Sequence, residues 1–261
     1  MNLTELRAAG RAVALAVAVG AALSGCSLFA SDKAAEETPV GYPRSWIWQT
    51  ATGISVQSDQ AKTVRGWVES QTLYQDSLVS YPGFADATSP ELLSGMTAAA
   101  NGPAKGGGTD RYLIRTLTVR DGELRASLCS DRWDEFGFDA DGSFVDAGTA
   151  LAVRDLVMRK SNTSGATPSA AFAQSLTDDQ PTPAPVGRLP YDTWLKGPTT
   201  NVFGGWIAVA WDVSVTPPSE CIAWFKRNHP QLGYPTGYTD DKRPNRPATP
   251  PPPTLPASPG W

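Results

Sequence analysis

The sequence is poor in the residues that most often carry catalysis, with one histidine and three cysteines in 261 residues. The histidine, His229, follows the last expected strand in a polar Lys-Arg-Asn-His-Pro stretch, which argues against a histidine-assisted nucleophile. No Gly-x-Ser-x-Gly elbow and no phosphate-binding glycine loop occurs. These absences favour a protein without catalytic residues, bound metal or cofactor.

An excess of charge of one sign is also lacking. The 22 basic and 26 acidic residues give a net charge of −4 and are not clustered. Nucleic-acid binding needs a basic face, so we expect no nucleic-acid partner. Nine tryptophans and a hydrophobic fraction of 41% supply enough apolar side chains for a packed domain.

The beginning of the chain has the pattern of an export signal. Arg7 and Arg11 are followed by an apolar run over 12–23, which is too short to span a bilayer as a helix. The run ends in Leu-Ser-Gly-Cys26, which resembles the lipobox of bacterial lipoproteins. The resemblance implies cleavage before Cys26 and attachment of lipid, such as palmitate, to that cysteine. An ordinary secretory signal and a retained membrane helix are the alternatives.

Location and attachment follow from the lipobox. Two or three acyl chains hold a protein stably on a bilayer, because each buried methylene contributes about 0.8 kcal/mol. We therefore expect loss of the signal peptide, residues 1–25, and anchoring of Cys26 on the outer face of the cell membrane. Residues 26–41 are rich in small and charged residues and are expected to form a flexible tether.

Lipidation of Cys26 leaves two other cysteines, Cys129 and Cys221. Two cysteines in an oxidising environment usually pair. We predict a disulfide bond between them, and two buried free thiols are the alternative.

The first half of the remaining chain has a helical period. Apolar residues recur at spacings of three and four from Ser58, a good N-cap, as far as Pro82. A second, shorter helix begins at Ser89-Pro90. The Trp-Ile-Trp sequence over 46–48 is expected to lie over the core, and residues 106–108 are expected to form a flexible glycine connector.

The second half has a period of two, typical of strands. The dipeptide Asp121-Gly122 predicts a hairpin turn between the first two strands. After the last strand, residues 221–225 are expected to pack back on the sheet. The expected strands cover residues 112–119, 124–129, 150–158 and 202–215.

Helices followed by a meander of strands indicate the α+β class, with N-terminal helices packed on a curved antiparallel sheet. A single domain is expected over 42–237, including a long loop at 161–200 with one short helix at 169–176. The proline-rich tail, 238–261, is expected to be disordered, extended and mobile.

Three features of the domain carry a resemblance to a known group of proteins. They are the long helix with Trp67, the Val-Arg-Asp-Gly-Glu hairpin that leads to Cys129, and the Gly-Gly-Trp sequence before Cys221. In this order they are similar to exported lipoproteins of high-GC Gram-positive bacteria and their phages. Several of these carry a cone-shaped domain of the nuclear transport factor two-like fold. The resemblance implies a concavity that a small ligand or lipid could occupy.

One acidic turn has some features of a calcium loop. Asp139, Asp141 and Asp146 surround Gly142, but the bidentate glutamate of such a loop is absent. A plain Asp-Gly turn is the favoured interpretation, and calcium binding by this turn stays open.

A second acidic group is Asp131, Asp134 and Glu135, which would supply the two carboxylates of a glycoside hydrolase. Carboxylates so close in sequence more often form a solvated loop, which is the interpretation we favour. Trp133 and Trp194 are the tryptophans expected in loops, and they are the candidates for a partner-binding surface.

The favoured function is therefore that of a membrane-anchored lipoprotein that binds a protein or glycan partner at the cell envelope without catalysis. A phage-encoded protein of this kind would act in superinfection exclusion. A small-ligand or lipid carrier and a cell-envelope glycoside hydrolase are the alternatives.

Overall fold

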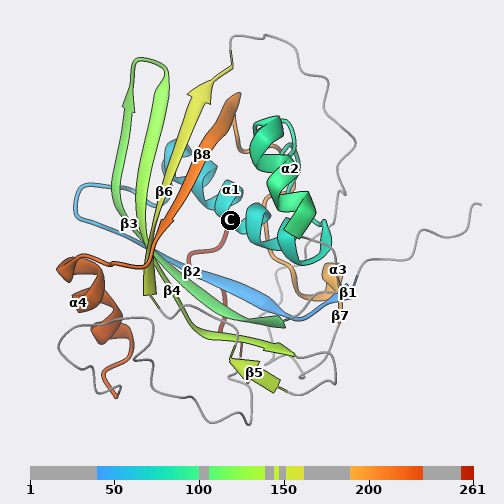
Figure 1. Cartoon of the computed structure of the whole chain (residues 1–261), viewed down its shortest axis with the longest axis vertical. Coiled ribbons are helices and arrows are strands. Elements are labelled where there is room, and N and C mark those ends of the chain that lie inside the picture. The colour runs from blue at the N-terminus through green and yellow to red at the C-terminus, as the bar shows by residue number, and fades with distance from the viewer. Residues whose placement is uncertain (1–39, 100–105, 139–143, 147–150, 162–188, 232–253) are drawn as a thin grey trace, which may run out of the picture. The chain divides into compact units, whose positions relative to one another are not determined.

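The computed structural model describes residues 40–99, 106–138, 144–146, 151–161, 189–231 and 254–261, all within the unit Thr38–Trp261 (Figure 1). Several predictions lie outside these ranges. They are the signal peptide, Cys26, nearly all of the tether, most of the acidic turn and the short helix at 169–176.

The main sheet of the described residues has the strand order β2–β3–β4–β6–β8, and β5 pairs with the end of β4. β2 runs parallel to β3, whereas the other neighbouring strands are antiparallel. The strands are β2 (Arg44–Thr50), β3 (Gly106–Arg120), β4 (Glu123–Phe138), β5 (Phe144–Asp146), β6 (Leu151–Lys160) and β8 (Trp206–Ser214).

The α+β class is confirmed, but the sheet is mixed and not purely antiparallel. The Trp-Ile-Trp sequence is the centre of β2 and not a cover over the core. Helices α1 (Asp59–Ser77) and α2 (Pro90–Ala99) connect β2 to β3, and such a crossover is what parallel neighbours require. A small second sheet pairs β1 (Val40–Gly41) with β7 (Leu189–Pro190), so the last two residues of the expected tether belong to the fold.

The predicted hairpin joins β3 to β4. Asp121 and Gly122 have φ values of 50° and 73°, the left-handed conformation that a tight two-residue hairpin turn needs at both positions. The pairing continues from this turn to Gly106 opposite Gly137. The hairpin is therefore much longer than the sequence pattern predicted.

Residues 106–108 are the start of β3, and the prediction of a flexible connector is wrong. A Cβ atom on Gly106 would lie 1.7 Å from the carbonyl oxygen of Phe136. One on Gly108, whose φ is +109°, would lie 2.1 Å from that of Asp134. Glycine is needed here because the two strands approach closely, not because the chain must bend freely.

The two helices predicted from Ser58 and from Ser89-Pro90 are present, and their ends follow the local sequence. The Ser58 hydroxyl accepts the backbone N–H of Ala61 at 3.2 Å, which caps α1. Leu78 ends α1 in the left-handed conformation. The segment after the last strand, expected only to pack back, forms helix α4 (Ser219–Asn228), and α3 (Tyr191–Trp194) is a single turn.

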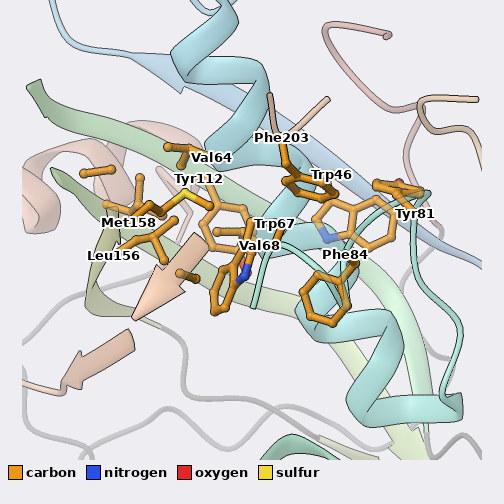
Figure 2. Packing of buried hydrophobic residues seen from close by; sticks show 14 of the residues in the cluster. Trp46, Val64, Trp67, Val68, Tyr81, Phe84, Tyr112, Leu156, Met158 and Phe203 are labelled. Carbon is orange, nitrogen blue, oxygen red and sulfur yellow. The ribbon is translucent and has the colours of Figure 1, made fainter. Parts of the chain in front are cut away.

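Two hydrophobic clusters lie on opposite faces of the sheet, because successive side chains of a strand alternate. Leu128 of β4 belongs to the larger cluster, in which Trp67 and Val68 of α1 face Tyr112 (Figure 2). Cys129, the next residue, belongs to the smaller cluster beneath α4. Each face of the sheet therefore buries its own set of apolar side chains.

The last described residues also differ from the prediction. Residues 254–261 were expected in the mobile tail, but they lie against β2 and α1, held by backbone and side-chain hydrogen bonds. Proline content alone does not reveal such contacts. Within the part of the chain that the structure describes, no helix is both long and apolar enough to cross a membrane.

Candidate functional site

The most polar buried region joins β2, β3, β4 and the end of α1. Arg44 lies at its centre: Nη1 donates to Glu135 Oε1 at 2.6 Å and to Asp110 Oδ2 at 3.0 Å, and Nη2 donates to Asp76 Oδ2 at 3.0 Å. Arg132 donates to the same oxygen of Glu135. We call these five residues the arginine–carboxylate cluster.

The charges within the arginine–carboxylate cluster set the protonation of its members. Burial favours the neutral form of Glu135, but Arg132 and Arg44 outweigh it and lower the pKa of Glu135 below its usual value. Burial is the largest effect on Asp110 and raises its pKa. Two neighbouring carboxylates with opposite pKa shifts are a pattern also found in acid–base pairs.

The geometry nevertheless differs from that of a catalytic pair. Asp110 is 0% exposed and Glu135 is 2% exposed, and Arg44 binds both. The Oδ1 atom of Asp110 and the Oε2 atom of Glu135 accept no hydrogen bond from the described residues. Arg44 binds three carboxylates at once, and Arg132 also binds Glu135, so the arrangement is that of a structural ion network.

A second pair brings the only histidine to a carboxylate. His229 Nε2 lies 2.8 Å from Asp131 Oδ2, and both side chains are buried. The polar stretch around His229 predicted an exposed histidine without a partner, but the structure buries it against a carboxylate. The two residues are 98 positions apart in the sequence, so no local pattern predicts their contact. It forms because α4 packs on β4.

The surroundings of the Asp-His pair indicate a structural role. Burial raises the pKa of Asp131, which also accepts the backbone N–H of Trp133 at 3.0 Å. The His229 ring packs 4.5 Å from the ring of Phe225, and its backbone N–H caps α4 by donating to the Phe225 carbonyl oxygen. In the described residues, the hydrogen-bond partner of its side chain is Asp131. The pair fastens the end of α4 to β4.

The acidic group of β4 is not a solvated loop, and this correction bears on the hydrolase hypothesis. Asp134 accepts a hydrogen bond from Arg111 at 2.5 Å, whereas Glu135 binds the two arginines of the arginine–carboxylate cluster. Asp131 faces α4 instead. Long-range pairing with arginine and histidine, which sequence proximity does not reveal, holds each carboxylate inside the fold.

The two candidate tryptophans lie in different places from those expected. Trp133 is part of β4, is 8% exposed, and packs 6.4 Å from Phe225 in the smaller cluster. Its expected position in an exposed loop is wrong. Trp194 ends α3, is half-buried, and lies 4.9 Å from Tyr191. Of the two, Trp194 is the one with accessible surface.

The predicted disulfide is confirmed. Cys129 of β4 and Cys221 of α4 are bonded, with their Cα atoms 5.5 Å apart, and both are fully buried.

No protein-family model matches the chain, and no curated protein or solved structure is detectably similar to it. The residues themselves must therefore carry the functional argument.

Among the residues placed by the structure, no group of three or more histidine, cysteine, aspartate or glutamate side chains is arranged so that it could hold a metal ion. Asp139 and Asp141 lie outside the described residues, and Asp146 lies in β5.

Proposed function

We propose that the protein is an exported lipoprotein, held on the outer face of the membrane by lipid on Cys26, whose domain binds a protein or glycan partner of the cell envelope. The observation that carries the proposal is the Leu-Ser-Gly-Cys26 sequence after a positively charged start and a short apolar run.

The Cys129–Cys221 disulfide supports an extracytoplasmic site. Glutathione and thioredoxin keep cytosolic thiols reduced, whereas disulfides persist outside the cytosol. With Cys26 lipidated, each of the three cysteines has a role that suits export.

The state of the carboxylates favours binding over hydrolysis. A glycoside hydrolase needs two accessible carboxyl groups on either side of the sugar bond. Here Asp131 is fully buried against His229, and Glu135 is buried against two arginines. Binding without catalysis is the simplest use of such a domain.

Superinfection exclusion is the specific form that we propose for a phage-encoded copy. A protein that masks an envelope structure depends on a high concentration at that surface, which a lipid anchor supplies. The carrier hypothesis rests on the resemblance to the cone-shaped lipoproteins. Mass spectrometry of lipid extracted from the purified protein would reveal a carried ligand.

The proposal is tested by expressing the full-length chain, the Cys26→Ala variant and the matched Ser27→Ala control in a phage-sensitive actinobacterial host. We expect the wild type and Ser27→Ala to enter the detergent phase and to reduce phage adsorption or DNA entry equally. Cys26→Ala should lose both properties at equal expression. Undiminished phage resistance from the unanchored variant would contradict the proposal.

A further inference from the structure

Residues 254–261 bind the free edge of β2 like a short added strand. The backbone N–H of Trp48 donates to the carbonyl oxygen of Ser258 at 2.6 Å, and the N–H of Ser258 donates to that of Trp46 at 3.1 Å. Ile47 and Ser258 form a parallel bridge. Leu255 adds a third backbone contact, because its N–H donates to the Thr109 hydroxyl at 2.8 Å.

The segment ends in an aromatic contact on α1, where Figure 1 marks its last residue. Trp261 Nε1 donates to Glu69 Oε2 at 3.2 Å. The indole lies 4.4 Å from the guanidinium of Arg65 and meets the ring of Tyr81 edge-on at 5.7 Å. One tryptophan thus makes a hydrogen bond, a cation–π contact and an edge-to-face contact.

The site for this tryptophan is built by the domain itself. Glu69 is 1% exposed and is oriented by Trp48 Nε1 and by the Tyr81 hydroxyl, each 2.7 Å from one of its carboxylate oxygens. The acceptor for Trp261 is therefore fixed by residues outside the segment. Preorganisation of this kind lowers the cost of binding.

Arg65 is the second element of the site. Its side chain is 1% exposed, and Nη2 donates to the carbonyl oxygens of Pro259 at 3.0 Å and Gly260 at 3.4 Å. Its Nε and Nη1 atoms are buried without a hydrogen-bond partner among the described residues. Among the described residues, this buried guanidinium therefore donates its hydrogen bonds to the segment.

We propose that the β2 edge together with Arg65, Glu69 and Tyr81 is a peptide-binding groove, and that residues 254–261 occupy it as an exchangeable ligand. The ligand class is an extended, proline-containing peptide that adds to a strand edge and presents a tryptophan N–H to a buried carboxylate. This inference goes beyond the proposed function, because it requires neither a lipid anchor nor an envelope partner.

The segment can exchange because it lies on the surface of the domain. Pro256, Ser258 and Gly260 are exposed, and Leu255 and Trp261 are half-buried. The buried residues of the two hydrophobic clusters all belong to the rest of the domain, and from the segment Trp261 packs against the larger cluster. Covalent linkage gives the segment a high effective concentration in the groove.

The test uses the full-length protein and the synthetic peptide Thr-Leu-Pro-Ala-Ser-Pro-Gly-Trp. The Trp261→Ala variant weakens the internal competitor, so we expect it to bind the peptide with one-to-one stoichiometry and at least ten-fold more tightly than the wild type in titration calorimetry. Pro256→Ala changes an exposed side chain of the segment and is the matched control, which should behave as the wild type.

Recognition of the indole N–H is tested with the Trp-to-Phe peptide, which keeps an aromatic ring but has no donor. It should bind the Trp261→Ala protein about ten-fold or more weakly than the tryptophan peptide, because the buried Glu69 side chain loses a hydrogen bond. Equal affinities would overturn the role of Glu69.

Two outcomes would overturn the groove itself. One is a Trp261→Ala protein that keeps its disulfide and its cooperative melting but binds no peptide. The other is a Trp261→Ala protein that fails to fold, because the segment would then be an inseparable part of the core.

Discussion

Glu69→Gln tests the energetic effect of the buried carboxylate of α1. The Glu69 side chain accepts hydrogen bonds from Trp48, Tyr81 and Trp261 and is almost inaccessible to solvent. Burial is the largest influence on this group and raises its pKa from 4.5 to about 7, although the hydrogen bonds and Arg65 oppose the change. The folded protein therefore binds a proton at this position more tightly than the unfolded chain.

The direction of the pH dependence follows from this difference. The contribution of a group whose pKa is raised in the folded state is complete below the unfolded value and is lost as the pH rises through the folded value. For Glu69 this window extends from about pH 4.5 to just above 7. The difference between the two pKa values corresponds to about 3 kcal/mol.

The measurement is urea unfolding at pH 4.5, 6, 7 and 8 with the disulfide intact, followed by circular dichroism. The wild type should lose about 3 kcal/mol of unfolding free energy across this range relative to Glu69→Gln. Glu91→Gln is the matched control, because Glu91 is exposed in the first turn of α2. A wild-type-minus-Gln difference that is constant with pH would refute the argument.

Three further substitutions test other parts of the fold. Replacing Cys129 and Cys221 with serine should lower the unfolding free energy by about 4–5 kcal/mol, because the bond spans a sequence separation of 92 residues; chemical denaturation measures the loss. His229→Ala should cost about 1–3 kcal/mol in the same assay, since buried Asp131 loses a partner. Gly108→Ala should lower the melting temperature strongly, because its Cβ would meet a strand carbonyl.

Short-range sequence patterns correctly predicted the first long helix and the first hairpin. The cap at Ser58, the Asp121-Gly122 turn and the period of two on either side of it correctly indicated α1 and the β3–β4 hairpin. The disulfide followed from counting cysteines. The helix and hairpin follow from residues that are neighbours in sequence, and the disulfide follows from the oxidising environment expected for an exported protein. None of them requires knowledge of the tertiary fold.

The errors share a different cause, which is pairing between distant segments. Arg44, Asp110 and Glu135 are far apart in the sequence, so the local run Asp131, Asp134 and Glu135 suggested only a solvated loop. None of Arg44, Asp110 and Glu135 lies in a segment that the sequence predicted to be a strand, so the need of these charges for buried partners was not recognised. No local sequence pattern indicated the contact of His229 with Asp131.

The arrangement of these ion pairs also changes how the hydrolase hypothesis can be tested. Amide variants of Asp131, Asp134 and Glu135 would remove the nearest carboxylates of His229, Arg111 and Arg132, and one of the three that bind Arg44. Removing one member of a buried pair typically costs about 3–5 kcal/mol. Loss of a phenotype in such variants would report unfolding as readily as catalysis.

The central claim is that lipid on Cys26 anchors the protein, and the most direct measurement is the intact mass of the protein recovered from the detergent phase of the expressing bacterium. The proposal predicts a polypeptide that begins at Cys26 and carries a diacylglyceryl group, with the Cys26→Ala variant absent from that phase. A polypeptide that still begins at Met1, or one that begins at Cys26 without added lipid, would contradict it.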